Sequence, residues 1–233
     1  AIGILGVLAV GLADAFFLAR VGDAELAAIG FVYPVIVAVS AFAIGMSAGA
    51  NAVLSQAMGR GEDDRNVARL ALHANVFGLL LGGSIGLALF LAGPVMFPLL
   101  GAEGAVQARI MDYLPWWAAS FPVLVTTMIL NASFRAAGDG TTPSGIMVLT
   151  AIVNIALTPV LVFGLGPMEA LGMAGAGIST LGARSLAVVL ALFLAIRRGR
   201  LRAGAHAARG ALGSVRRIVS VGLPAAASRG VKP

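Results

Sequence analysis

Residues 1–19 read AIGILGVLAVGLADAFFLA, a nearly uninterrupted apolar run with one carboxylate, Asp14, inside it. A membrane-spanning helix needs ~20 mostly apolar residues. A charge near the middle of such a helix costs roughly 2.5–3.5 kcal/mol on insertion scales, and acids kept there usually mark ion pathways or proton relays. Asp14 is therefore the first candidate functional residue.

Five more apolar runs follow the first one. Only 11% of the 233 residues are charged, 59% are hydrophobic and the mean hydropathy is +0.98; a soluble domain carries about 25% charged residues. The sequence therefore predicts an all-α polytopic membrane helix bundle with six transmembrane helices and the start of a seventh. The six predicted spans cover residues 1–20, 31–57, 68–92, 110–132, 144–165 and 173–196.

The remaining residues complete the predicted domain organisation. Residues 1–196 form a six-helix domain, 197–217 a basic loop and 218–233 the start of a seventh span. The first run begins already apolar, and the seventh covers only about half of the hydrocarbon core before charged residues return. We therefore expect a truncated chain.

The arginines are distributed unequally between alternate loops. Loops after spans 2, 4 and 6 hold eleven arginines, and loops after spans 1, 3 and 5 hold two. By the positive-inside rule the N-terminus is cytoplasmic, and the basic stretch 197–217 is a cytoplasmic loop rather than a nucleic-acid-binding arm. Tyr113, Trp116 and Trp117 then fall at the outer end of span 4, where an aromatic belt is expected. We predict a multi-pass protein of the plasma or inner membrane.

The composition excludes several kinds of chemistry. The chain has no cysteine, two histidines and a single lysine, Lys232. Thiolate metal sites, a cysteine nucleophile and a Walker A phosphate loop are therefore excluded, and a histidine-rich metal site is not expected. We predict a protein that is not an enzyme and has no catalytic residues, metal centre or cofactor other than a coupling ion.

Depth within the spans brings four polar side chains toward one level. Counted from the predicted outer ends of their spans at 1.5 Å per residue, Asp14, Thr158 and Thr180 lie ~12 Å deep, and Asn154 lies ~18 Å deep. Asn154 and Thr158 are four residues apart and share a helix face. Carboxylate, amide and hydroxyl oxygens suit a hard cation such as Na⁺ or a relayed proton. These four residues are the predicted ion- or proton-coupling site.

Two neighbouring residues bear on this site. Pro159 predicts a helix kink, because it cannot donate a backbone hydrogen bond to the carbonyl of Ile155. Arg184 lies ~18 Å into span 6; it either lines a cavity as a charge or pairs with Asp14 and holds it ionised. In the structural alternative, Asp14 only fixes helix packing through hydrogen bonds to neighbouring Thr or Ser.

Four strings in register carry a family resemblance. Together they resemble the first lobe of the MATE (multidrug and toxic compound extrusion) transporters over nearly the whole chain. The strings are LADAFFLARVG at 12–22, SQAMGRG at 55–61, FRAAGDGTTP at 134–143, and Asn154 through Pro159 to LGMAGAGIST at 171–180. Members have two six-helix lobes related by pseudo-symmetry and exchange Na⁺ or H⁺ for organic cations. This chain would then be the N-terminal lobe, whose partners are the bilayer, an organic cation and the missing C-terminal lobe.

The chain departs from the family pattern at one place that matters for the site. Many members carry an acid four residues after the span 5 asparagine, where this chain has Thr158. Asp14 is therefore the only acid deep in the predicted spans. The resemblance implies an antiporter working by alternating access. Two alternatives stay open: a lipid-linked oligosaccharide flippase of the same superfamily, and a non-transporting subunit or truncated gene product.

Overall fold

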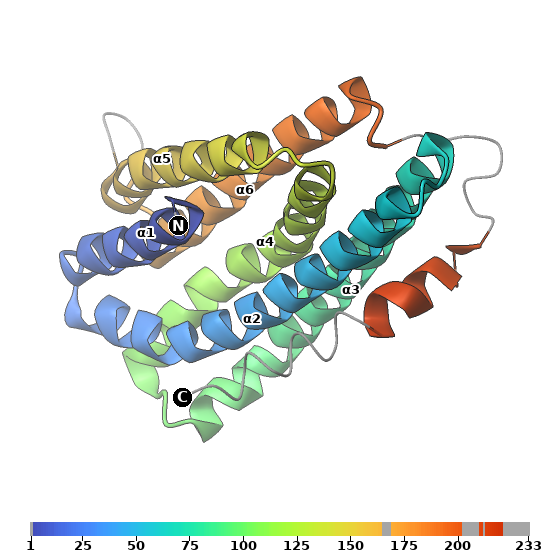
Figure 1. Cartoon of the computed structure of the whole chain (residues 1–233). Coiled ribbons are helices and arrows are strands. Elements are labelled where there is room, and N and C mark those ends of the chain that lie inside the picture. Colours follow the sequence, from blue (N-terminus) through green and yellow to red (C-terminus); the bar gives the residue numbers. More distant parts are fainter. Residues whose placement is uncertain (1, 165–168, 202–209, 212, 221–233) are drawn as a thin grey trace. The chain divides into compact units, whose positions relative to one another are not determined.

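The computed structural model describes residues 2–164, 169–201, 210–211 and 213–220, and its regular elements are α-helices (Figure 1). Residues 213–220 are also helical. The bounded helices are α1 (Ile2–Ala19), α2 (Asp23–Gly59), α3 (Asp64–Leu99), α4 (Gly104–Ala136), α5 (Thr141–Phe163) and α6 (Gly172–Arg197).

The predicted all-α polytopic membrane bundle is confirmed. Helices α2 to α6 are each long and apolar enough to cross a membrane, and α1 contributes the shorter apolar stretch Val10–Ala19. Each helix overlaps one predicted apolar run. Much of the predicted basic loop and of the seventh span, residues 202–209, 212 and 221–233, lies outside the described residues. The predicted domain boundaries therefore stay a prediction.

The longest helices extend beyond their apolar runs. α2 has 37 residues, which corresponds to ~55 Å, whereas the hydrocarbon core is ~30 Å thick. Its first turn contains Asp23 and Glu25, and acidic side chains there interact favourably with the positive end of the helix dipole. Because a count of apolar residues ignores such polar turns, the predicted span began only at residue 31.

The described helices form two compact units, each built from parts of several helices. Unit 1 comprises Ala1–Val37, Gly83–Phe121 and Met147–Ala187, and unit 2 comprises Ala38–Gly82, Pro122–Ile146 and Val188–Pro233. Unit 1 thus contains α1 together with the start of α4, the end of α5 and the start of α6. These are the elements that carry the predicted site.

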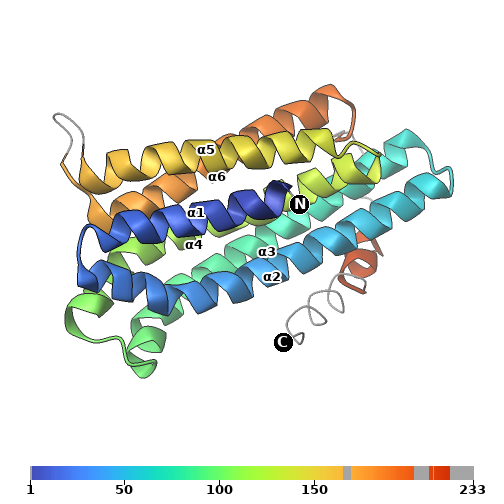
Figure 2. The ribbon, with the colours of Figure 1, turned by 60° about the vertical axis from the view of Figure 1, so that its left-hand side comes forward.

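Close backbone contacts position α6 within unit 1. A Cβ atom added to Gly175 would lie 2.5 Å from the carbonyl oxygen of Leu161 on α5, and one added to Gly177 would lie 3.0 Å from the carbonyl oxygen of Tyr113 on α4. Figures 1 and 2 show α5 and α6 side by side. Small residues at these positions let helix backbones approach closely.

In unit 2, glycines likewise allow α3 and α4 to approach closely. Cβ atoms added to Gly78 and Gly82 would meet Ile129 and the backbone of Pro122, respectively. α4 is the most buried of the candidate spans, so it can carry polar side chains away from lipid. Several of these hydroxyls donate back to their own helix, for example Thr127 Oγ1 to the Val123 carbonyl at 2.8 Å.

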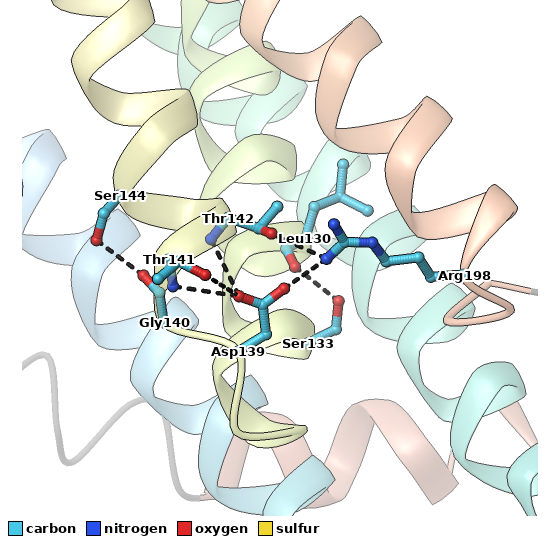
Figure 3. A network of polar contacts seen from close by, with 8 residues as sticks. All are labelled: Leu130, Ser133, Asp139, Gly140, Thr141, Thr142, Ser144 and Arg198. Carbon is cyan, nitrogen blue, oxygen red and sulfur yellow. Dashed lines mark hydrogen bonds and ion pairs between the residues drawn. The ribbon is translucent and has the colours of Figure 1, made fainter.

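A polar network in unit 2 joins the α4–α5 connection to the end of α6 (Figure 3). Asp139 Oδ1 accepts hydrogen bonds from the backbone N–H groups of Thr141 at 3.1 Å and Thr142 at 3.0 Å. Its Oδ2 forms an ion pair with the guanidinium of Arg198, which also donates to Thr142 Oγ1. The carboxylate therefore caps the first N–H groups of α5 and ties them to the chain just after α6.

This network predicts an acid-sensitive contribution to stability. The Thr142 backbone N–H, with smaller effects from Thr141 and Arg198, holds the pKa of Asp139 well below its ordinary value of 3.8. The stabilisation is then complete above pH 3.8 and is lost as the pH falls toward the folded-state pKa. We expect Asp139→Asn to lower Tm at pH 7 and to flatten the decrease in Tm below pH 4, measured by thermal unfolding in detergent. Asp23→Asn, an exposed acid in the first turn of α2, is the control; equal pH profiles for wild type and Asp139→Asn would contradict the assignment.

Candidate functional site: a buried carboxylate among hydroxyls and an amide

Asp14 faces the interior of unit 1. Its side chain is 9% exposed, whereas Leu12 is 74% and Phe16 51% exposed. Leu18, one turn further along α1, is fully buried, so positions 14 and 18 lie on one inward face. The rotation of α1, which depth alone left open, therefore places the acid away from lipid tails.

Thr158 on α5 contacts this acid directly. Its hydroxyl lies 3.1 Å from Asp14 Oδ1 and 2.9 Å from the backbone carbonyl of Asn154. The hydroxyl carries a single proton and can donate it to one of these acceptors at a time. An ionised Asp14 is the stronger acceptor, whereas a neutral Asp14 leaves the helix carbonyl to compete. The charge on Asp14 thus decides which of the two oxygens accepts the hydrogen bond from the Thr158 hydroxyl.

α6 adds two further hydroxyls to the cluster. Ser179 Oγ lies 2.9 Å from Thr158 Oγ1, and Thr180 Oγ1 accepts a hydrogen bond from Asn154 Nδ2 at 3.4 Å. Both hydroxyls are within hydrogen-bond distance of the Ala176 carbonyl on their own helix. The structure therefore brings together all four residues of the predicted site, from α1, α5 and α6.

One oxygen of the cluster has no hydrogen-bond partner among the described residues. Asn154 is 3% exposed, and its Oδ1 accepts no hydrogen bond from the described residues. A buried amide oxygen left unpaired costs about 1–3 kcal/mol. An acceptor of this kind, beside a carboxylate and three hydroxyls, fits an oxygen-coordinating hard cation or a proton carried on water. We call Asp14, Asn154, Thr158, Ser179 and Thr180 the carboxylate cluster.

The oxygens of the carboxylate cluster suit a hard cation. Among the described residues no group of three or more His, Asp or Glu side chains is placed to hold a metal ion. Imidazole and thiolate ligands favour zinc, copper and iron, whereas carboxylate and carbonyl oxygens favour harder cations. The oxygens of the carboxylate cluster belong to the second kind.

Pro159 lies inside α5 next to the cluster. The helix continues through it to Phe163, so the proline does not end the helix. Its missing N–H leaves the Ile155 carbonyl without its usual helical donor. A kink at Pro159 stays a prediction.

Arg184 lies one helical turn after Thr180 and bonds to a residue that the sequence did not single out. Its guanidinium donates to Ser120 Oγ on α4, and Ser120 in turn donates to the Trp117 carbonyl at 2.6 Å. Arg184 interacts electrostatically with Asp14, but of the ion pairs among the described residues none joins the two. The direct pair considered from the sequence is therefore absent.

α4 contributes more to this region than the sequence predicted. Tyr113 and Trp117 were expected in an interfacial belt, yet they are 3% and 1% exposed, and only Trp116 is exposed, at 40%. Tyr113 interacts with Asp14 and Arg184. The belt assignment is wrong for Tyr113 and Trp117, because spacings of four and three residues place 113, 117 and 120 on one inward face.

Known proteins match this chain in sequence and in fold. A family model described as MatE matches residues 1–160. A FAD transporter of Shewanella oneidensis is 37% identical over 201 residues, covering 86% of this chain and 44% of the relative. A probable multidrug resistance protein NorM of Thermotoga maritima is 26% identical, covering 93% and 46% of the two chains.

Solved structures share the arrangement of the helices. The MATE transporter VcmN of Vibrio cholerae in its bent form matches with a TM-score of 0.89 and 26% identity, over 97% of this chain and 50% of that chain. A MOP superfamily transporter from Pyrococcus furiosus, described as having a binding pocket of reverse polarity, matches with a TM-score of 0.86 over the same shares at 26% identity. The chain spans about half the length of the relatives it matches. With these matches in sequence and fold, this multi-pass membrane protein belongs to the MATE family of transporters.

Proposed function

We propose that this chain supplies the ion-coupling half of a cation-coupled antiporter that exports organic cations by alternating access. The carboxylate cluster takes up H⁺ or Na⁺ from the cell exterior, the side toward which the positive-inside rule places the nearer ends of α1, α5 and α6. The observation that carries this proposal is the buried Asp14 carboxylate beside the Thr158 hydroxyl and the unpartnered Asn154 oxygen. An acid inside a membrane-spanning helix is energetically costly, and such residues usually have a functional role.

Ion uptake is coupled to substrate release because the coupling ion and the organic cation compete for Asp14. A Na⁺ ion or proton at the carboxylate neutralises the negative charge that would otherwise hold an organic cation in the same interior. The Thr158 hydroxyl then returns to the Asn154 carbonyl, and the contact between α1 and α5 weakens. By linkage, the coupling ion lowers the affinity for the organic cation by the same factor as the organic cation lowers the affinity for the coupling ion. The partner against which this half moves would be the second lobe of the full-length protein.

The test is a transport assay on the full-length protein in liposomes. Export of a fluorescent organic cation is followed after a pH jump and, separately, after a Na⁺ jump. We expect one of the two jumps to drive export and the other to have no effect, which also identifies the coupling ion. An export rate that neither the pH jump nor the Na⁺ jump changes would exclude a cation-coupled antiporter and would favour the flippase or the non-transporting alternative.

Thr158 offers a finer test of the cluster. Thr158→Val removes the hydroxyl next to Asp14 with little change in volume, and we expect the half-maximal concentration of the coupling ion to change by about tenfold to hundredfold, because a hydrogen bond to a charged group contributes about 1.5–3 kcal/mol. Thr127→Val is the matched control, since Thr127 is also buried and also bonds its own helix. Equal ion dependence in the two variants would remove Thr158 from the coupling site.

A second candidate function is export of FAD, a dianionic dinucleotide. The relative with 37% identity is named a FAD transporter, and the Pyrococcus furiosus transporter is described as having a pocket of reverse polarity. The half-buried guanidinium of Arg184 favours an anionic substrate, whereas a purely cationic one would be repelled. Direct competition between FAD and an organic cation for export separates the two candidates.

A further inference from the structure

Arg184 carries a half-buried charge that no contacting acid of the described residues neutralises. Arg184 lies on the inward face of α6, where Ala183 and Ala187 are buried while Leu186 is 44% exposed. Its guanidinium presents five N–H donors, and within the part of the chain that the structure describes it makes one hydrogen bond, to Ser120. No acid among the described residues lies within ion-pair distance of it.

Ser120 orients this guanidinium by accepting a hydrogen bond from it. The serine side chain is fully buried, and its proton is used in the bond to the Trp117 carbonyl. Its lone pairs are therefore left to accept from Arg184. The Trp117 ring stacks with Phe121 at 6.4 Å between ring centroids, so the backbone that anchors the serine is itself held by large buried side chains. The arginine is thus held in place from α4.

The acid whose charge acts on Arg184 does not contact it. Asp14 interacts with Arg184 across the interior, but its carboxylate is engaged by Thr158. A half-buried charge without a contacting counter-ion can take one from a ligand that enters the same interior. The donors of the planar guanidinium that do not contact Ser120 match the paired oxygens of a phosphate or carboxylate.

From this arrangement we infer that Arg184 determines specificity for transported molecules that carry a phosphate or carboxylate group, with Ser120 as its positioning residue. The inference rests on the second candidate function, export of an anionic substrate, and adds to it the residue that would recognise the anionic group. Asp14 and Arg184 then have different roles: the carboxylate binds the coupling ion, and the guanidinium binds the anionic end of the substrate. A molecule with only positive charge would be disfavoured by Arg184.

The experiment uses two flavins that differ by one phosphate. Equilibrium dialysis with the protein in lipid nanodiscs gives the Kd of riboflavin 5′-phosphate, of riboflavin and of the cation ethidium. For Arg184→Met we expect about tenfold to hundredfold weaker binding of the phosphate ester, because one charge-assisted contact is lost. Riboflavin affinity stays within about twofold, and ethidium binds more tightly because a repelling charge is gone.

Further variants separate recognition from a structural role. Arg184→Lys keeps the charge without the planar fork and restores part of the preference for the phosphate ester. Ser120→Ala lowers that preference without abolishing it, and Arg109→Met, an exposed arginine of unit 1, leaves it unchanged. Equal weakening of both flavins in Arg184→Met, or a wild type that binds them equally well, would overturn the inference. Ion-driven export measured in parallel keeps the two proposals apart: if it persists while the flavin preference is absent, only the specificity assignment fails.

Discussion

Asp14→Asn in the full-length protein is expected to abolish ion-driven export while leaving the amount of protein in the membrane unchanged. Asparagine has nearly the same shape as aspartate, and its Oδ1 can still accept a hydrogen bond from Thr158, although more weakly than the carboxylate; the site then resembles the neutral state of Asp14, and the fold is retained. The amide carries no charge to attract Na⁺ and takes up no proton in the physiological range. The loss should therefore affect coupling rather than folding.

The measurement is export from liposomes after a pH or Na⁺ jump, with membrane insertion checked by the protein recovered in the bilayer fraction. Asp112→Asn provides the matched control, because Asp112 is an exposed acid on α4 that pairs with Arg109. We expect that control to transport like the wild type. Jump-driven export by Asp14→Asn at the wild-type rate would show that Asp14 only fixes helix packing, and the coupling proposal would fall with it.

The apolar runs were sufficient to predict the helical membrane fold, and the acid among them suggested where to look for a site. Length and hydropathy set where helices cross the membrane, and the rise of 1.5 Å per residue placed Asp14, Thr158 and Thr180 at one depth. The structure adds that these side chains also face one another, through the Asp14–Thr158 and Asn154–Thr180 contacts. Depth is a one-dimensional quantity, so it could suggest but not establish these contacts.

Rotation about the helix axis is what the sequence could not supply. In a soluble helix the polar face marks the solvent side, whereas in lipid both the interior and the exterior of a bundle are apolar. Tyr113 and Trp117 were consequently assigned to an interfacial belt, although both are buried in unit 1. For the same reason Ser120, the partner of Arg184, went unnoticed. The spacing of Tyr113, Trp117 and Ser120 on one face was the available signal.

Small residues fix that rotation in the structure, and Gly175 gives the sharpest test. A Cβ atom at this position would lie 2.5 Å from the Leu161 carbonyl oxygen, 2.6 Å from its carbonyl carbon and 2.9 Å from the Val162 nitrogen. All three are backbone atoms, so no rotamer change relieves the overlap and α6 must move away from α5. Overpacking of this kind typically costs 1–3 kcal/mol, and we expect Gly175→Ala to lose about that much stability, measured as a lower Tm in detergent.

The same displacement should reach the carboxylate cluster, because Ser179 and Thr180 follow Gly175 on α6 by one turn. Ser179 lies 2.9 Å from Thr158 and Thr180 lies 3.4 Å from Asn154, so a shift of α6 by a fraction of an ångström lengthens both contacts. Gly175→Ala is therefore expected to weaken the binding of the coupling ion about tenfold or more, a change that a purely local packing defect would not produce. Gly182→Ala is the matched control on the same helix, since its added Cβ meets its nearest atom at 3.8 Å, an ordinary contact. A Gly175→Ala protein that unfolds at a lower temperature yet binds the ion like the wild type would show that the position of α6 does not govern the site.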